Sequence, residues 1–377
     1  MDFSLSEEQE MLKKTARDFL TDKCPKTLVR EMEDDEKGYP PELWREMAEL
    51  GWMGLVFPEK YGGSDMSFLD LAVLLEEMGR ACLPAPFFST VVLGGLSVLE
   101  AGSEEQKQQY LSRIAGGEAI FTLALTEARA RYDADSITVK ATADGDAYVI
   151  SGTKLFVPDA HIADYLLCVA RTNEQIEAEK GITIFIVDAK SKGISYTVLK
   201  TMAGDKLCEV VFDKVRVPKG NILGQLDQGW GIVQKAIERA AAAKCCEMVG
   251  TIQRVLEMTV DYAKERKQFD RPIGSFQVIQ HYCANMATDV DGSRFTVYQA
   301  AWMLSEGLPC AKEVAIAKAW VGEAYGRIST LAHQIHGAIG CTIDHDLQFY
   351  TKRGKAAVLT FGSGDFYREV VAQEMGL

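Results

Sequence analysis

The pattern of apolar residues changes twice along the chain, and this change constrains the fold more than any other feature. From about residue 120 to 217 the apolar runs are short and β-branched, with turn pairs such as Asp144-Gly145 and Ser151-Gly152 between them. Such runs are typical of strands in a sandwich or barrel. The segments before and after repeat their apolar residues at helical spacing. The sequence therefore predicts two helical domains with a β domain between them.

Helix start signals support the first helical domain. Ser6 with Gln9 three residues later forms a capping-box pattern, and Pro40-Pro41 opens a helix that Gly51 closes. The last part of the chain holds long alanine-rich helical patterns, which suit a four-helix bundle. These patterns cover about Trp230–Arg266, Phe276–Ser305, Ala311–Gln334 and Phe366–Glu374.

The predicted fold is an α+β multidomain chain. Residues 1–118 form an N-terminal helical domain, residues 119–225 a central β-barrel or sandwich, and residues 226–377 a C-terminal four-helix bundle. Gly116-Gly117 marks the first border, and Pro218, Gly220 and Gly224 mark the second.

Composition argues against several classes of protein. No apolar run reaches the roughly 18–20 residues that a membrane-spanning helix needs. The net charge is −13 and no basic stripe stands out, so neither a membrane nor a nucleic acid is an expected partner. The nine cysteines are scattered without a C-x-x-C pattern, and the N-terminus is acidic rather than leader-like. A cytoplasmic location is therefore expected.

Several common site motifs are absent. The sequence has no G-x-G-x-x-G after a strand, no phosphate-binding G-x-x-x-x-G-K-[ST] and no H-E-x-x-H. His333 and His336 could share a helix face, but a third ligand is missing, so no metal site is expected.

Three short segments could serve a phosphate-bearing cofactor. They are Thr122–Glu127, Tyr262–Phe269 followed by Phe276-Gln277, and Gln334–Gly340. Arg266 offers a planar fork to a phosphate, and glycines let the backbone approach a ligand. Each segment alone has an ordinary structural explanation, a solvated arginine for the second and a helix C-cap for the third.

Together and in this order, the three segments resemble the acyl-CoA dehydrogenase family. The matching motifs are A-L-T-E, Y-A-x-E-R-x-Q-F with F-Q, and Q-x-x-G-x-x-G, together with Gly152-Thr153-Lys154 and Val215–Pro218. The resemblance covers nearly the whole chain. It implies FAD as cofactor, an acyl-CoA thioester as substrate, an electron-transfer flavoprotein as acceptor and usually a homotetramer. The expected role is in the degradation of fatty or other carboxylic acids.

The resemblance also implies which residues meet the cofactor. Leu125, Thr126 and Phe156 would flank the flavin ring. Arg266, Gln268 and Phe269 would meet the FAD of a neighbouring subunit, and Gln277 is a further cofactor residue. Gln334, Gly337 and Gly340 would approach the adenosine and pyrophosphate side, and Ser363 and Asp365 the ribose and phosphates.

The catalytic base is a departure from the usual family pattern. Many members carry it in a C-terminal E-G-T segment, where this chain has Phe361 followed by Gly362. A second branch places it on the first long C-terminal helix before an arginine, which here corresponds to Glu238 and Arg239. The resemblance thus implies Glu238 as α-proton base, Arg239 as support, and the Phe361 backbone N–H as donor to the thioester oxygen. An ordinary solvated helix glutamate is the alternative for Glu238.

The implied reaction is α,β-dehydrogenation, with hydride transfer to flavin N5. The uncharged segment Leu83–Leu93 is expected to border the acyl pocket through Phe87, Thr90 and Val91, with Tyr132 nearby. The absence of an arginine near Pro84 argues against a dicarboxylyl substrate. A base on the helix is found in branched-chain, long-chain and bulky-ring members of the family, so the resemblance implies a branched, alicyclic or medium-to-long acyl chain.

Two further departures leave more than one function open. Arg131 and Tyr132 replace a Gly-Ser pair of the family, and Pro158 stands where a flavin-contacting Thr or Ser is common. The chain could accordingly be a non-catalytic or half-active subunit of a heterotetramer with a paralogous chain. It could also be a flavin monooxygenase on the same fold, or a flavin-free CoA-binding or scaffold protein.

Overall fold

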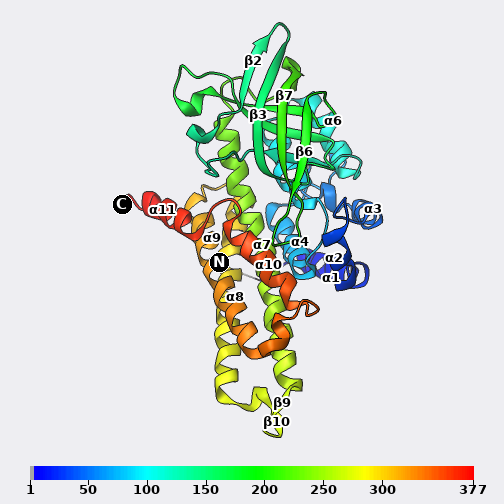
Figure 1. Cartoon of the computed structure of the whole chain (residues 1–377), viewed down its shortest axis with the longest axis vertical. Coiled ribbons are helices and arrows are strands. Elements are labelled where there is room, and N and C mark those ends of the chain that lie inside the picture. Colours follow the sequence, from blue (N-terminus) through cyan, green and yellow to red (C-terminus); the bar gives the residue numbers. More distant parts are fainter. Residues whose placement is uncertain (1–3) are drawn as a thin grey trace. The chain divides into compact units, whose positions relative to one another are not determined.

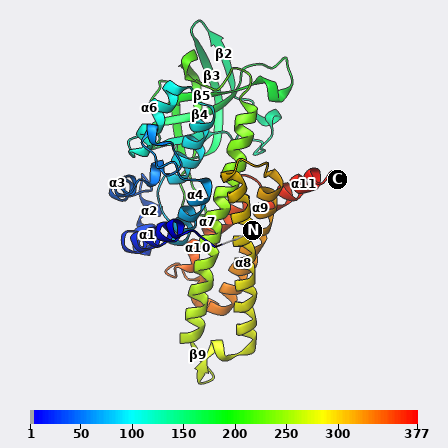
Figure 2. The same cartoon turned by 180° about the vertical axis from the view of Figure 1, so that it is seen from behind.

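The computed structural model describes residues 4–377, so Met1–Phe3 of the acidic N-terminus lie outside the described residues. The chain divides into two compact units (Figures 1 and 2). Unit 1 consists of the described part of Met1–Glu31, Ser67–Leu83 and Ala241–Leu377. Unit 2 consists of Met32–Met66 and Pro84–Ala240. Helix α7 (Trp230–Glu265) starts in unit 2 and continues into unit 1.

A mixed eight-stranded sheet forms the core of unit 2 and confirms the predicted β domain. Its order is β6-β7-β3-β2-β4-β5-β8, and β1 pairs with β4 in parallel. The strands are β1 (Phe121–Ala124), β2 (Lys140–Asp144), β3 (Ala147–Pro158), β4 (Tyr165–Arg171), β5 (Ile182–Asp188), β6 (Ile194–Leu199), β7 (Leu207–Pro218) and β8 (Ile222–Leu223).

Buried and exposed residues follow the strand pattern expected from the sequence. The interiors of β4 and β5 are buried without interruption, while β7 alternates over its first half. One strand begins later than the apolar run Ile137–Val139 suggests. The backbone N–H groups of Thr138 and Val139 donate to the Glu127 carboxylate instead, and β2 starts at Lys140.

Short helices complete unit 2. They are α3 (Pro41–Glu49), a π-helix η3 (Phe88–Gly95), α5 (Leu96–Ala101) and α6 (Glu104–Ala115), with part of α2 (Lys26–Asp34). Helix η3 packs on β1, α5 and α6. Gly94 lies so close to the Phe121 side chain that an added Cβ would sit 2.3 Å from its Cβ. This close approach fixes η3 against β1.

Unit 1 is helical. Besides its part of α7, it contains α1 (Glu7–Lys23), α4 (Phe68–Ala81), α8 (Gln277–Ser305), α9 (Ala311–His336), α10 (Leu347–Leu359) and α11 (Gly364–Glu374). The short hairpin β9 (Lys267–Gln268) and β10 (Arg271–Pro272) joins α7 to α8, and these two helices run side by side (Figures 1 and 2). The predicted capping box of Ser6 and Gln9 is confirmed.

Close backbone contact holds α4 against α7. A Cβ on Gly250 would lie 1.7 Å from the Glu76 carbonyl oxygen, and one on Gly79 would lie 2.0 Å from that of Glu247. The same helix pair carries a two-pronged ion pair, in which Arg80 donates to Glu257 at 2.8 and 2.5 Å. Small residues and paired charges thus set this packing.

Helix α10 is an addition to the predicted helices. Its charged stretch Lys352–Lys355 interrupts the apolar spacing, and Gly354 lowers its helix propensity. Gly354 is needed because a Cβ there would lie 1.8 Å from the Tyr325 ring of α9. Within residues 4–377, no helix combines the length and apolarity that crossing a membrane requires.

Candidate active site

The segment after β1 is held by a buried ion pair in unit 2. Lys154 Nζ lies 2.7 Å from Glu127 Oε1 and also donates to the Leu125 carbonyl at 3.0 Å. The Leu155 N–H donates to the Thr126 carbonyl at 2.8 Å. Two of the predicted flavin residues, Leu125 and Thr126, are therefore fixed through their backbone by β3.

The Glu127–Lys154 pair is shielded from solvent. Burial lowers the pKa of Lys154, and the neighbouring Cys168 and Glu127 oppose that change. Burial alone would raise the pKa of Glu127, but the charge and hydrogen bond of Lys154 hold it below its ordinary value. Each group offsets part of the cost of burying the other, through an ion pair and a hydrogen bond at 2.7 Å.

Phe156 presents an aromatic surface in the same region. It has a φ of +55°, which a bulky residue rarely adopts, and its side chain is 50% exposed. The pairing of β3 with β7 shifts register between Lys154 and Val157, so Phe156 lies in this irregularity. An exposed ring on a strand that also fixes Thr126 fits a planar, largely apolar cofactor ring.

The predicted acyl-pocket residues lie beside β1. Phe87, Thr90 and Val91 are buried at the start of η3 and within it. Thr90 Oγ1 accepts a hydrogen bond from the Phe121 N–H at 3.3 Å. Tyr132 lies partly exposed in the loop that follows Glu127.

Arg171 anchors the later part of that loop. It donates to the carbonyls of Ile137 at 2.9 Å and Ala134 at 2.5 Å. The loop that carries the unusual Arg131 and Tyr132 is thus tied to β4 at its far end.

Glu238 and Arg239 lie on the unit 2 part of α7. Arg239 Nη2 is 2.7 Å from Glu100 Oε2, and Lys235 Nζ is 2.6 Å from the other oxygen of the same carboxylate. Glu238 is half-buried and lies one helical turn before the buried Ala241 and Ala242. The single carboxylate of Glu100 thus pairs with two cations of α7, Lys235 and Arg239.

Four predicted cofactor residues lie at one end of the unit 1 helices. Arg266, Gln268, Phe269 and Gln277 occupy the end of α7, the hairpin and the start of α8, and all four are exposed. Phe269 has a φ of +51° and an 86% exposed side chain. Arg266 is thus free to offer its guanidinium fork to a phosphate, and Phe269 an apolar face.

The third motif lies next to α7 in unit 1. The Tyr262 ring stacks on His336 with ring centroids 4.5 Å apart, and Tyr262 Oη donates to the His336 carbonyl at 3.4 Å. Gly337 follows with φ +64° and ψ −145°, a conformation that only glycine adopts readily. Gln334 is exposed and Gly340 buried. The stacking thus brings the second and third sequence motifs together.

The turn at Phe361 joins α10 to α11. Phe361 is buried at φ +60°, and its carbonyl accepts a hydrogen bond from Tyr367 Oη at 2.6 Å. Ser363 caps α11, and Asp365 pairs with Arg368 at 2.6 Å. The Gly362 carbonyl of this turn also accepts a hydrogen bond from Lys318 at 2.9 Å, a residue that belongs to none of the sequence motifs. A lysine in an alanine-rich helix is ordinarily solvated, so the sequence carries no signal for its burial.

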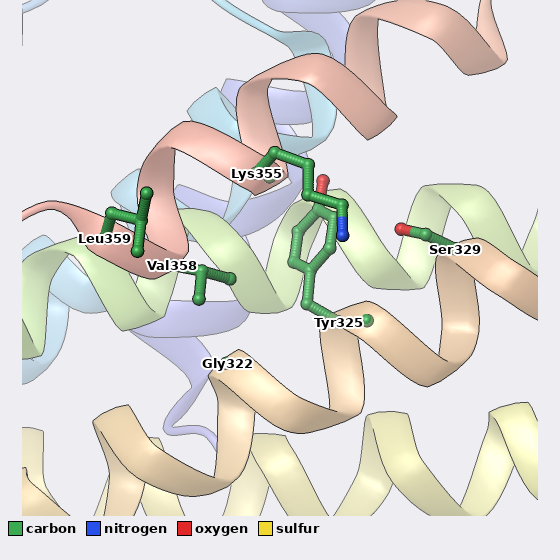
Figure 3. A pocket seen from close by; sticks show the side chains of 8 residues that line it. Gly322, Tyr325, Ser329, Lys355, Val358 and Leu359 are labelled. Atoms are coloured by element: carbon green, nitrogen blue, oxygen red, sulfur yellow. The ribbon is translucent and has the colours of Figure 1, made fainter. Parts of the chain in front are cut away.

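A separate groove of about 230 Å³ lies between α9 and α10 in unit 1 (Figure 3). The Lys355 side chain extends toward Tyr325 and Ser329 in it. The described residues that line it include none of the predicted site residues; they are Gly322, Tyr325, Gly326, Ser329, Gly354, Lys355, Val358 and Leu359. No group of three or more His, Cys, Asp or Glu residues within 4–377 is arranged to hold a metal ion.

Comparison with known proteins decides the family. The models of the acyl-CoA dehydrogenase N-terminal, middle and C-terminal domains match residues 6–118, 122–215 and 227–376. The probable acyl-CoA dehydrogenase YngJ of Bacillus subtilis is 33% identical over 382 residues, which cover 100% of each protein. The chain belongs to the acyl-CoA dehydrogenase family.

Two other similar proteins have names that describe complexes. CarC, a subunit of the caffeyl-CoA reductase-Etf complex of Acetobacterium woodii, is 32% identical over 89% of each protein. A chain in the structure of the ChsE4-ChsE5 complex from Mycobacterium tuberculosis matches with a TM-score of 0.91 and 27% identity. That match covers 100% of this chain and 99% of the other.

Family membership makes the chain an FAD-dependent oxidoreductase. The residues present fit this cofactor, because Phe156 and Phe269 expose apolar rings and Arg266 exposes a cation for a phosphate. The family fold is confirmed as well, with N-terminal helical, middle β-sheet and C-terminal helical domains. The exact borders at residues 118 and 225 stay predictions.

Proposed function

We propose that this chain catalyses the α,β-dehydrogenation of an acyl-CoA thioester with a branched, alicyclic or medium-to-long acyl chain. The observation that carries the reaction class is the match of all three family domains, from residue 6 to residue 376. The proposed role is in the breakdown of fatty or other carboxylic acids.

Two groups of the chain act on the thioester in this proposal. Glu238 removes the α-proton, and the Phe361 N–H donates a hydrogen bond to the thioester oxygen, where negative charge develops. Bound FAD supplies the hydride acceptor. Arg239 is a positioning residue for α7, because its ion pair with Glu100 ties this helix to α5.

Phe361 stands where many family members have a glutamate, and this difference removes the proton acceptor but not the backbone N–H. A phenyl ring cannot accept a proton, so the base must come from elsewhere. The backbone N–H is present with any side chain except proline. The Phe361 N–H can therefore bind the thioester oxygen even though the Phe361 side chain takes no part in proton transfer.

The apolar segment that leads into η3 favours an uncharged acyl group. Phe87 and Val91 are buried and apolar, and the segment Leu83–Leu93 carries no charge. A charged acyl tail would lose its hydration there without gaining a partner. An uncharged acyl group is therefore the proposed substrate.

We also propose an electron-transfer flavoprotein as the electron acceptor. The support is the likeness to CarC, which belongs to a complex named for its reductase and Etf components. The name of that relative describes reduction, the reverse direction of the same bond chemistry. The direction in this chain is proposed as dehydrogenation.

A second candidate function has its own support. Arg131 and Tyr132 replace small residues near the flavin segment, and Phe361 replaces a common base. The likeness to a chain of the ChsE4-ChsE5 complex is compatible with pairing of two different chains. In this candidate the chain is a half-active or non-catalytic subunit of a heterotetramer, whereas the main proposal expects a homotetramer.

Replacing Glu238 by glutamine tests the base. The variant should retain FAD but lose about 10²–10⁴-fold in kcat, the usual contribution of a general base. Glu247→Gln is the matched control, since Glu247 lies half-buried on the same helix and pairs with Lys244 at 2.5 Å. Turnover near that of the wild type in Glu238→Gln would overturn the base assignment.

The wild-type chain itself tests the alternative functions. If it turns over only with a co-purifying partner chain, the second candidate holds. Rapid reoxidation of the reduced flavin by oxygen would instead indicate a monooxygenase.

A further inference from the structure

We propose that Lys318 and Tyr367 hold the Phe361–Gly362 turn in one conformation and thereby fix the direction of the Phe361 N–H. Both would be positioning residues for the thioester oxygen. This inference rests on the proposed function, in which that N–H is a hydrogen-bond donor to the substrate. All of the contacts that support it lie in unit 1.

Lys318 is a buried cation that donates its hydrogen bonds to carbonyl groups. Its side chain lies in α9 and is 1% exposed. Its ammonium donates to the carbonyls of Ala357 at 3.1 Å, Val358 at 3.0 Å and Gly362 at 2.9 Å. An ammonium has three protons, so these bonds use all of them. Within residues 4–377, Lys318 forms no ion pair with a carboxylate.

Two of these carbonyls belong to the last turn of α10. Carbonyl groups there lack the N–H partners that a continuing helix would supply, and a cation at a helix C-terminus is favourable. The third carbonyl belongs to Gly362, beyond the helix. One ammonium group thus ties the end of α10 to the turn that follows it.

Tyr367 holds the neighbouring peptide group from α11. Its hydroxyl donates to the Phe361 carbonyl at 2.6 Å, and its ring lies 5.8 Å from Lys318 Nζ. On the other side, the Thr360 N–H donates to the Ala356 carbonyl at 3.1 Å. The Phe361 N–H lies between these fixed groups, so its direction is set by them.

The backbone at this turn needs such support. Phe361 has a φ of +60° and Gly362 a φ of +115°. A bulky residue in the left-handed region is unfavourable and persists only where its surroundings impose it. Lys318 donates to the Gly362 carbonyl and Tyr367 to the Phe361 carbonyl, so each of the two residues is held by a side chain.

Burying a lysine without a countercharge is costly. Burial lowers the pKa of Lys318 to about 8; the neighbouring Cys245 opposes this change and Lys244 adds to it. The group therefore remains an ammonium at neutral pH. Capping the end of α10 would not require a buried charge, because a neutral donor or a water molecule can also bind helix carbonyls. The buried ammonium of Lys318 is therefore consistent with a role beyond capping.

Hydrogen–deuterium exchange of residues 356–366 tests the holding of the turn directly, with the full-length holoprotein. Tyr367→Phe keeps the ring and removes one donor, and Lys318→Met removes the other. Each should raise amide exchange at 361–364 by at least about ten-fold, as expected when roughly 1.4 kcal/mol of local stability is lost. Lys355→Met is the matched control, because Lys355 is an exposed lysine of α10. It should leave exchange unchanged.

Kinetics and a spectroscopic probe then test the positioning role. Tyr367→Phe should lower kcat about ten-fold at a nearly unchanged KM and FAD content, a smaller loss than removing an oxyanion donor altogether. Cinnamoyl-CoA is the probe, since hydrogen bonding to the carbonyl of a conjugated thioester shifts its absorption to the red. That shift should shrink in Tyr367→Phe and Lys318→Met but not in Lys355→Met.

Three results separate the possible failures. Unchanged exchange at 361–364 in both variants would overturn the inference. Faster exchange with unchanged kcat and an unchanged cinnamoyl-CoA shift would also overturn it, because the turn would then serve stability alone. A wild-type chain that neither binds nor turns over any acyl-CoA would overturn the proposed function, while the exchange data would still report how the turn is held.

Discussion

At the scale of single residues, Arg266 offers a direct test of cofactor binding. Its side chain is exposed at the end of α7, while its carbonyl accepts a hydrogen bond from the Ile273 N–H at 2.8 Å. Arg266→Ala should therefore leave the hairpin in place and weaken FAD binding by about 10–100-fold, the loss of one hydrogen bond to a charged group. Lys264→Ala, an exposed change on the same helix, is the control. Equal FAD affinity in both variants, measured by flavin fluorescence, would contradict the assignment.

The residues of the site differ in how well a sequence reveals them. The three short motifs indicate the segments at Thr126, Arg266 and Gly337, whereas the contact between two of these motifs, through Tyr262 stacking on His336, is visible only in the structure. Lys318 is invisible in the sequence, because its burial depends on where the end of α10 lies. The roles of Glu238 and of the Phe361 N–H stay predictions.

At the scale of elements, the buried Glu127–Lys154 pair connects the segment after β1 to β3. Removing one partner leaves an unpaired buried charge, so Lys154→Met should lower the free energy of unfolding by about 3–5 kcal/mol. The surface pair of Lys140 and Glu174 provides the control, and Lys140→Met should cost less than about 1 kcal/mol. Chemical denaturation of both variants gives the comparison. A loss in Lys154→Met as small as in the control would show that the pair contributes little.

The Arg80–Glu257 pair between α4 and α7 predicts a pH dependence of stability. Burial would raise the pKa of Glu257, but the hydrogen bonds and charge of Arg80 outweigh it and lower this pKa to about 2. The folded pKa is below the unfolded value of about 4.3, so the pair stabilises the fold above that pH and loses its effect as the pH falls toward 2.

Glu257→Gln tests that dependence. The wild type should be more stable than the variant at pH 7, and the difference should shrink steadily between about pH 4.5 and pH 2. Arg80 is present in both proteins, so the pH dependence of their difference in stability reports on the Glu257 carboxyl group. A difference that stays constant over this range would show that the carboxyl of Glu257 has no lowered pKa.

The sequence predicted those helices whose bounds depend on neighbouring residues. The capping box at Ser6 and the long helices α8 and α9 formed near the predicted bounds. Two elements depended on distant contacts instead. The start of β2 is delayed because Glu127 binds the N–H groups of Thr138 and Val139, and α10 is stabilised by the fit of Gly354 against Tyr325. Neither contact has a local signature.

At the scale of the whole molecule, the order of helical, β and helical segments was readable from periodicity alone. The family resemblance added the cofactor and the reaction class, and the domain matches across residues 6–376 confirm the family. Assembly is beyond the reach of such patterns, because both paired and identical chains can use the same motifs. We expect a homotetramer, and light scattering of the purified chain would measure its mass. A stable assembly that requires a different chain would favour the second candidate function.

We propose that this chain, by itself, binds FAD and oxidises an acyl-CoA. The most direct test is the visible spectrum of the chain purified alone, with flavin counted per chain, during anaerobic addition of a panel of acyl-CoA thioesters. We expect close to one FAD per chain and bleaching of the flavin band by a branched, alicyclic or medium-to-long acyl-CoA. Flavin well below one per chain, or no bleaching with any thioester, would contradict this proposal.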